Sequence, residues 1–278
     1  MKNHFYIGYV GNKRQEVEHI LENIDLTNIT TIIEPFCGTS AMSYYIHTKY
    51  PNKFNYILND NDQNLMKLYE IAKNGAIDDF FNRINNLCFN EQGEFINKER
   101  YKELVNVNDV EGWYIGHKYY CMVSGLYPKY RKVNPIKKEL GKGLTDFLKT
   151  DNVKLSCIDA VDLVDQYKDD EKCLIFLDPP YINLCNDFYN CGGGNIYEYL
   201  NEKREIAANP KSKVVAVVNE TWLNDIIFFN YKCIKYSKKY QLGVKKNKKV
   251  MHCLYTNQKS QKSQKSRKSK SKNHIQSI

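Results

Sequence analysis

Four consecutive residues, Asp178-Pro179-Pro180-Tyr181, place a carboxylate, two prolines and an aromatic ring directly after a strongly apolar run. Proline has no backbone N–H, so this turn presents acceptors without competing donors. Such a turn suits a planar exocyclic amine. The Asp178 carboxylate and the Pro179 carbonyl can accept its two N–H groups and direct the nitrogen lone pair at an electrophile, while Tyr181 stacks on the base. The alternative is a proline-stiffened loop that a tyrosine caps.

Two further motifs lie upstream at the ends of apolar runs. The segment EPFCGTS (residues 34–40) forms a small-residue turn before a helical segment, where a ligand can approach the backbone near a helix N-terminus. Asp60 follows Gly38 by 22 residues and can accept hydrogen bonds from a ribose. An ordinary turn and a helix N-cap near Asp60 are the alternatives. Taken together, the two motifs favour a nucleoside site.

These motifs follow apolar segments that alternate with helical ones. Nearly continuous apolar runs are typical of strands buried on both faces. Strands separated by helices predict an α/β fold with a mostly parallel sheet covered by helices. The expected strands are 30–35, 54–60, 154–158, 172–178 and 213–220, with an antiparallel pair at 231–237 and 249–257, and the expected helices are 40–50, 63–72 and 160–167.

Residues 74–150 break this alternation and are too long for a simple crossover. They contain a helical segment, NKERYKELV, and an aromatic and basic stretch, WYIGHKYYCMVSGLYPKYRKVNP. They form either a functional insertion or a small helical subdomain. The chain is therefore predicted to contain one domain built from residues 1–73 and 151–257, an insertion at 74–150 and a basic tail at 258–278.

The net charge of +9 comes mostly from the tail. Residues 257–273 hold seven Lys or Arg and no acid, so subtracting their charge from +9 leaves +2 for the rest of the chain. The tail is a lysine-serine repeat with almost nothing apolar to bury, which predicts disorder. It could hold DNA, RNA or another anionic surface through salt-dependent contacts, act as a localisation signal, or serve only as a solubilising terminus.

Several classes of protein are excluded by the composition. The nine cysteines are scattered and form no CxxC pair, which predicts reduced thiols in an intracellular protein and neither a disulfide framework nor a zinc site. No apolar run approaches the roughly 18 residues of a membrane helix. The N-terminal residues contain no apolar signal region, so we expect a protein that is neither secreted nor bound to a membrane.

The order of the motifs resembles that of the Dam-like D12 class, the α group of N6-adenine-specific DNA methyltransferases. YIGYVGNKR is followed by EPFCGTSA, LNDNDQNL, an insertion and LDPPY, and KKYQLGVKKNKKVMHCLYTN is similar to the last hairpin of that group. The resemblance covers about residues 5–257, and LDPPY in this order is its most specific part. It implies a Rossmann-like, S-adenosylmethionine-dependent methyltransferase sheet with an inserted, mainly helical target-recognition region.

The resemblance also implies a role for each matching residue. The aromatic residue and the lysine of the N-terminal motif line the cofactor and adenine pocket, and the turn after the first strand packs around the methionine moiety. The acid after the second strand binds the ribose, and the DPPY aspartate contacts both the cofactor and the target amine. The implied cofactor-binding residues are Tyr9, Lys13, Glu34, Phe36, Gly38, Asp60, Asp159 and Asp178, and the implied catalytic residues are Asp178, Pro179 and Tyr181.

Three positions depart from the family's pattern. Ser40 stands where a second glycine is usual in the turn, and His252 stands where the last hairpin often has a glutamate. The N-terminal motif commonly carries tryptophan and paired glycines, and here it has Tyr9, Gly11 and Asn12. Tyrosine keeps a stacking surface in place of tryptophan. None of these changes removes a group that the chemistry requires, so we expect an active enzyme.

The implied reaction is methyl transfer from S-adenosylmethionine to N6 of adenine at a specific short site in double-stranded DNA. The target base must flip out of the duplex, and no metal is needed. The resemblance leaves a cognate restriction endonuclease open as a partner. The alternatives are an RNA adenine methyltransferase and an inactive methyltransferase-fold protein that binds nucleic acid. The residues expected to contact nucleic acid are Lys118, Tyr127, Lys129, Tyr130, Arg131 and Lys132.

Overall fold

The computed structural model describes residue 6 and residues 13–107, 109–119, 127–128, 133–179, 210–242 and 246–258. Of residues 239–242 and 246–249 it describes the backbone alone.

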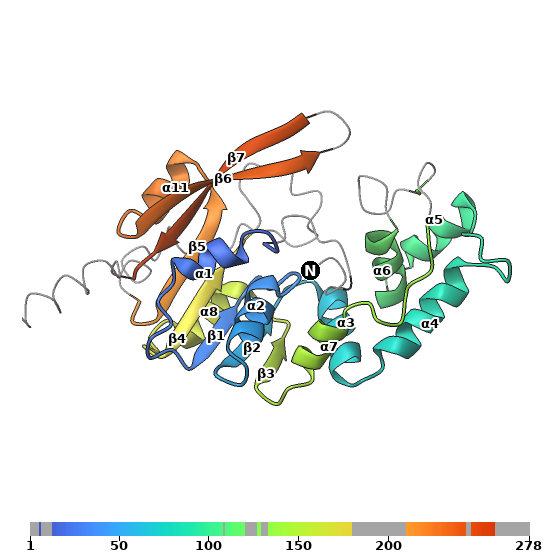
Figure 1. Cartoon of the computed structure of the whole chain (residues 1–278), viewed down its shortest axis with the longest axis horizontal. Helices are drawn as coiled ribbons and strands as arrows, with labels where there is room; N and C mark the ends of the chain where they lie inside the picture. The colour runs from blue at the N-terminus through green and yellow to red at the C-terminus, as the bar shows by residue number, and fades with distance from the viewer. Residues whose placement is uncertain are drawn as a thin grey trace, which may run out of the picture.

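A seven-stranded sheet forms the centre of the molecule, with the strand order β3-β2-β1-β4-β5-β7-β6 (Figure 1). The pairs among β1 to β5 are parallel, whereas β7 is antiparallel to both β5 and β6. The strands are β1 (Thr31–Glu34), β2 (Asn55–Asn59), β3 (Val153–Ser156), β4 (Cys173–Leu177), β5 (Lys213–Asn219), β6 (Lys232–Leu242) and β7 (Lys246–Thr256).

The predicted α/β fold and its seven strands are confirmed. β1, β2, β4 and β5 begin and end within one residue of the predicted segments, and β3 begins one residue earlier and ends two residues earlier than predicted. The closing antiparallel pair is also confirmed, although both of its strands are longer than predicted. β6 and β7 have 11 residues each and continue as a two-stranded ribbon past the edge of the sheet (Figure 1).

Helices cover both faces of the sheet, which explains why the strands are apolar throughout. In β1, Ile32 packs into the cluster on one face and Ile33 into the cluster on the other. The first face carries α1 (Val17–Glu22), α2 (Ala41–Lys49), α3 (Gln63–Lys73) and α7 (Lys142–Leu148), and the second carries α8 (Ala160–Tyr167) and α11 (Trp222–Ile227).

The described part of residues 74–150 is helical and lies beside α3 (Figure 1). Its helices are α4 (Ile77–Cys88), α5 (Lys98–Asn106), α6 (Val110–Lys118) and α7. Tyr6 joins this part to the rest of the core, because its ring lies 5.9 Å from Phe81 of α4 and 6.3 Å from Tyr69 of α3. Its hydroxyl also lies 2.7 Å from the Thr145 hydroxyl of α7. The insertion and the sheet therefore share one hydrophobic core.

The helices α4 and α6 were expected only as unlocated parts of a mainly helical insertion. Three short helices of the described chain, α1, α7 and α11, were not predicted at all. Each has seven residues or fewer, so its apolar face repeats too few times to stand out in the sequence. Two helices of the insertion begin at side-chain caps. The Asn97 side chain accepts a hydrogen bond at the start of α5, and the Asp109 side chain does so at the start of α6.

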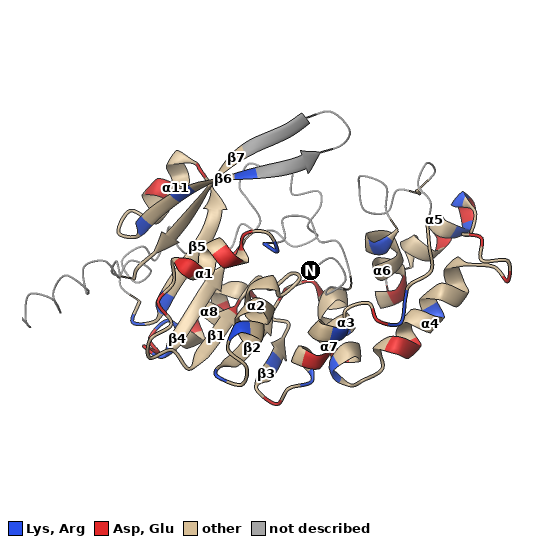
Figure 2. Cartoon of the chain, viewed as in Figure 1, with Lys and Arg blue, Asp and Glu red and all other residues tan. Residues whose placement is uncertain are grey.

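Both charge signs occur throughout the described body. Lys, Arg, Asp and Glu are interspersed along most of the helices and on several loops (Figure 2), in line with the small net charge that remains without the tail. The six described cysteines are free thiols. Among the described residues, no helix combines the length and the apolarity that crossing a membrane requires.

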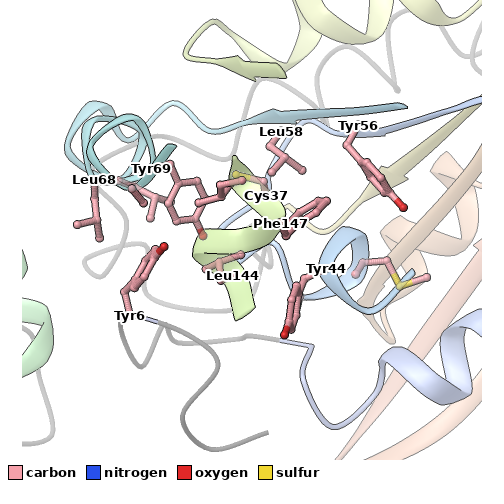
Figure 3. Packing of buried hydrophobic residues seen from close by; sticks show 14 of the residues in the cluster. Tyr6, Cys37, Tyr44, Tyr56, Leu58, Leu68, Tyr69, Leu144 and Phe147 are labelled. Carbon is pink, nitrogen blue, oxygen red and sulfur yellow. The ribbon is translucent and has the colours of Figure 1, made fainter. Parts of the chain in front are cut away.

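Replacement of Phe147 tests whether α7 belongs to the core that covers the sheet. Its ring is 1% exposed and lies 5.0 Å from that of Tyr56 in β2 (Figure 3). Phe147→Ala should lower the free energy of unfolding by about 3–5 kcal/mol, measured by urea titration. Phe229→Ala removes the same side chain where it is 54% exposed, and it should cost less than about 0.5 kcal/mol. Equal losses would place α7 outside the core.

Candidate active site

The carboxyl ends of β1 and β4 meet where the winding of the sheet reverses. From β1 the chain continues through β2 to β3 at one edge, and it returns to β4 on the other side of β1. In open α/β sheets, the crevice outside this reversal is where ligands bind. Glu34 is the last residue of β1, and Asp178 directly follows β4. Two of the predicted site residues are therefore placed at this position.

The turn after β1 is held to the loop after β2 by direct hydrogen bonds. The Gly38 N–H donates to Asp60 Oδ2 over 2.9 Å, and the Tyr69 hydroxyl donates to the Gly38 carbonyl over 2.6 Å. The structure thus joins Gly38 and Asp60, which were predicted to act together. Burial raises the pKa of Asp60 to about 6 and outweighs the hydrogen bonds from Asp62 N–H and Gly38 N–H, which lower it.

Ser40 shows why this turn favours glycine. Its backbone is left-handed, with φ +52° and ψ +33°, a conformation that costs a residue with a Cβ atom roughly 1–2 kcal/mol. The Ser40 N–H donates to the Cys37 carbonyl over 2.6 Å, and Gly38 also has a positive φ of +46°. The departure from the family's pattern at position 40 therefore keeps the turn, with some backbone strain.

Asp62 caps α3, the helix that follows this loop. The sequence left open whether the acid at position 60 binds a ribose or belongs to a helix N-cap, and the hydrogen bonds distinguish these two roles. Its Oδ1 atom accepts hydrogen bonds from the N–H groups of Asn64 and Leu65 at the start of α3. Its Oδ2 atom accepts from the Trp113 indole of α6 over 2.9 Å. Asp60 instead accepts the N–H of Asp62 on Oδ1, over 3.1 Å. The N-cap of α3 is thus Asp62, and Asp60 is oriented toward the turn after β1.

Asn59 joins three loops at this edge of the sheet, and sequence analysis missed it. Its buried side chain donates 3.0 Å hydrogen bonds to the carbonyls of Pro35, after β1, and Ile158, after β3. Its Oδ1 atom accepts the N–H of Ile158 over 3.0 Å. The signal in the sequence is an asparagine that ends an apolar strand, where a buried amide must find partners.

Glu34 is a buried carboxyl group at the end of β1. Its Oε1 atom accepts the backbone N–H of Ser43 in α2 over 2.6 Å. Burial raises the pKa of Glu34 to about 7; the hydrogen bonds from Ser43 oppose this shift, and the negative charge of Asp178 adds to it. Near neutral pH this group therefore exists in both charge states, and a nearby cation would favour the ionised form.

Lys13 and Asp178 form an ion pair in which the lysine is buried and the aspartate side chain is 19% exposed. Lys13 Nζ lies 2.5 Å from Asp178 Oδ1, and the Lys13 side chain is 4% exposed. Burial raises the pKa of Asp178, whereas the charge of Lys13 lowers it. The structure thus brings together two predicted residues that are far apart in the chain. Pro179 is buried beside them, and Tyr9 and Tyr181 lie outside the described residues.

Asp159 and Phe36 lie at the same edge of the sheet. Asp159 caps α8 by accepting the N–H of Val161 over 2.8 Å, and Phe36 packs against the apolar cluster on the α8 face. Their contacts with a cofactor remain predictions.

Two of the residues predicted to contact nucleic acid are described, and both have contacts within the protein. Lys118 Nζ lies 3.5 Å from the Tyr6 carbonyl. The Tyr127 hydroxyl donates to the Ile96 carbonyl over 3.0 Å, and its ring lies 5.5 Å from that of Tyr101. The remaining four, Lys129, Tyr130, Arg131 and Lys132, lie outside the described residues.

A second buried charged group adjoins the Lys13–Asp178 pair and was also missed. Glu16 accepts hydrogen bonds from the Tyr236 hydroxyl and from His252 Nδ1, each over 2.8 Å, and from Lys238 Nζ. His252, one of the departures from the family's pattern, is fully buried in this contact. No local pattern in the sequence predicts the buried contacts of Glu16, because its partners are more than 200 residues away in the chain.

Comparison with known proteins identifies similar sequences. Residues 9–195, most of the chain, match the family model described as D12 class N6 adenine-specific DNA methyltransferase. The type II methyltransferase M.MjaIII of Methanocaldococcus jannaschii is 27% identical over 212 residues, which cover 63% of this chain and 68% of that protein. The type II methyltransferase M.CviBI of Paramecium bursaria Chlorella virus NC1A is 22% identical over 254 residues, covering 84% and 90%. The resemblance inferred from the motifs is confirmed.

Solved structures resemble the chain only distantly. A precorrin-6y C5,15-methyltransferase from Geobacter metallireducens GS-15 is 10% identical with a TM-score of 0.38, covering 90% of this chain and 92% of its own. The delta-N METTL16 MTase domain is 8% identical with a TM-score of 0.39, covering 90% and 84%. The fold assignment therefore rests on the order and directions of the strands.

The raised pKa of Glu34 predicts a stability change that depends on pH. An acid whose pKa is higher in the folded than in the unfolded protein loses stabilising protonation as the pH rises from about 4.5 to about 7. Glu34→Gln should therefore increase the free energy of unfolding relative to wild type at pH 8, by up to about 3 kcal/mol, and much less at pH 5. Urea titrations at both pH values measure this difference.

Glu22→Gln is the matched control, because Glu22 is exposed at the end of α1. Its effect on the free energy of unfolding should be small and equal at the two pH values. A Glu34→Gln effect that does not change between pH 5 and pH 8 would contradict the raised pKa of this buried carboxyl group.

Proposed function

Because this chain belongs to the D12 class N6 adenine-specific DNA methyltransferase family, we propose that it methylates N6 of adenine at a specific short site in double-stranded DNA. S-adenosylmethionine is the proposed methyl donor, and the target base is proposed to flip into a pocket formed by Asp178, Pro179 and Tyr181. The observation that carries the proposal is the Lys13–Asp178 ion pair at the reversal point of the sheet.

The charges at this edge of the sheet fit a cationic cofactor better than a phosphorylated one. Glu34, Asp60 and Asp178 place three poorly solvated carboxyl groups there, and they would repel a pyrophosphate. The Gly38 N–H, which would cradle phosphate in a dinucleotide site, is already engaged by Asp60. S-adenosylmethionine has no phosphate and carries a sulfonium and an ammonium group, and when bound it supplies an activated methyl group.

The residues proposed to hold this cofactor are those at the carboxyl ends of β1 to β4. Asp60 Oδ2 accepts the Gly38 N–H and Oδ1 accepts the Asp62 N–H, and a carboxylate has about four lone-pair sites, so it can also accept from a ribose hydroxyl. Glu34 supplies a negative charge once a cation favours its ionised form. The full proposed set is Tyr9, Lys13, Glu34, Phe36, Gly38, Asp60, Asp159 and Asp178.

The proposed catalytic contribution of the chain is alignment. Asp178 and the Pro179 carbonyl would accept the two N6–H groups of adenine, which orients the nitrogen lone pair toward the methyl group. The Lys13 ammonium favours the ionised form of Asp178 and so opposes the effect of burial, and an ionised carboxylate is the stronger acceptor. Tyr181 would stack on the flipped base and offset part of the few kcal/mol that flipping costs.

DNA contacts outside the catalytic edge are proposed for the insertion. Its aromatic and basic residues Lys118, Tyr127, Lys129, Tyr130, Arg131 and Lys132 suit phosphate contacts and wedging between bases. Site-specific methylation of this kind would protect DNA from an endonuclease that recognises the same site. A cognate restriction endonuclease is therefore the proposed partner.

Replacement of Asp178 tests the proposed reaction. Asp178→Ala should reduce transfer of label from S-adenosylmethionine to unmethylated double-stranded DNA by at least about 100-fold, because it removes a charged acceptor of the target amine. Nucleoside analysis of the digested wild-type product should show N6-methyladenine. Glu171→Ala is the matched control, since Glu171 is exposed near the opposite end of β4, and it should retain full activity.

Each alternative outcome identifies a different function. Wild-type turnover in Asp178→Ala would overturn the site assignment. Label that enters RNA and not DNA would identify an RNA methyltransferase. Absence of turnover in the wild type, with cofactor binding intact, would identify a binding protein.

Deletion of the tail tests its part in DNA binding. Gln258 exchanges hydrogen bonds with the backbone of Asp25, over 2.7 Å and 3.1 Å, so the deletion should begin at residue 259. Removal of 259–278 eliminates seven positive charges. If these charges contact phosphates, the salt dependence should become weaker: the magnitude of the negative slope of log affinity against log salt concentration should fall by up to about 6. Serine-to-alanine changes in the tail keep its charge and should leave the slope unchanged. An unchanged slope in the deletion would show that the tail does not contact DNA.

A further inference from the structure

Glu16 is a buried carboxylate whose described side-chain donors all come from the β6–β7 hairpin. Tyr236 and Lys238 belong to β6, and His252 belongs to β7. Glu16 itself precedes α1, at the other end of the chain. The contact therefore attaches the base of the hairpin to the N-terminal segment, with the Glu16 side chain only 6% exposed.

Glu16 is also tied to Lys13 through the backbone. The N–H groups of Glu16 and Val17 donate to the Lys13 carbonyl over 2.8 Å and 2.9 Å. These two bonds form the turn that opens α1, so the position of Lys13 depends on the position of Glu16. The Lys13 side chain then extends from this turn to Asp178.

The charges of these residues depend on one another. Burial would raise the pKa of Glu16, but the hydrogen bond from His252 and the charges of Lys13 and Lys238 lower it to about 2. The group is therefore ionised and accepts only, so His252 Nδ1 must carry the hydrogen in this contact. Burial lowers the pKa of Lys238, and repulsion from the positive charge of Lys13 lowers it further. The Glu16 carboxylate offsets this repulsion.

We propose that Glu16 is a positioning residue for methyl transfer: by binding the hairpin and balancing the two lysines, it fixes the Lys13 ammonium on Asp178. This inference rests on the proposed function, and it assigns to the hairpin a part in building the active site. Among the described residues, the charged and titratable groups that face Asp178 are Lys13, Glu16, Lys238 and Glu34. If the Glu16 charge is removed, Lys13 and Lys238 lose one of the nearby carboxylates that compensate their positive charges.

A double-mutant cycle in the full chain tests the proposal. The variants are Glu16→Gln, Lys13→Met and both together, and the measurement is kcat for methyl transfer to double-stranded DNA at saturating S-adenosylmethionine. If Glu16 acts through Lys13, Glu16→Gln should lower kcat about tenfold or more in the wild-type background and less than about twofold in Lys13→Met. A merely structural residue would give the same fold loss in both backgrounds.

Two further variants make the outcome unambiguous. Glu18→Gln removes an exposed carboxylate from the same helix and should leave kcat unchanged. Tyr236→Phe removes a single hydroxyl donor to Glu16. It should lower kcat less than Glu16→Gln does, again only when Lys13 is present. If a thermal melt shows that Glu16→Gln does not fold, Tyr236→Phe tests the positioning role of Glu16 in its place.

The cycle separates this inference from the proposed function. Equal fold losses in both backgrounds, combined with a large loss in Lys13→Met, would overturn the positioning role and leave the proposed function in place. Wild-type turnover in Lys13→Met would overturn the positioning role together with the role of Lys13 in the proposed site. The Asp178→Ala assay would then still test the reaction independently.

Discussion

The ion pair between the buried Lys13 and the partly exposed Asp178 is the interaction on which the site depends. Moving either charge out of water alone costs several kcal/mol, and their 2.5 Å contact offsets that cost only when both are in place. Lys13 comes from the segment before α1, and Asp178 follows the strand at the reversal point of the sheet. The pair therefore forms only in the completed tertiary fold. The same requirement extends to Glu16, whose partners come from the last two strands.

The polar groups at the carboxyl edge are satisfied by one another, which fixes the loops there. A buried polar atom without a partner is costly, so the loops must adopt the arrangement that provides one. Asn59 bonds to the loops after β1 and β3, and Asp60 bonds to the turn at Gly38. These contacts hold three loops together in the described structure, which suits a site that must align two reactants.

The sequence predicts the elements and motifs that carry a local pattern. Apolar runs identified all seven strands, and the motifs at their ends converge because parallel strands share a carboxyl edge. Glu16 could not be predicted, because it is recognisable only by contacts more than 200 residues away. The short helix α7 was missed because seven residues contain too little periodicity. The roles of Asp60 and Asp62 could be separated only by the direction of their hydrogen bonds.

The charge of the catalytic edge also determines what the rest of the protein must do. Carboxyl groups at Glu34, Asp60 and Asp178 suit a cationic cofactor and a neutral amine, but they repel the phosphates of the DNA that carries that amine. A flipped base can enter such a site only if its phosphates are held elsewhere by positive charge. Basic residues at 129–132 in the insertion, at 244–249 in the hairpin and in the tail provide that charge in the sequence. Acidic residues at the proposed catalytic edge and basic segments elsewhere in the sequence suit the two ligands that the proposed reaction must bring together.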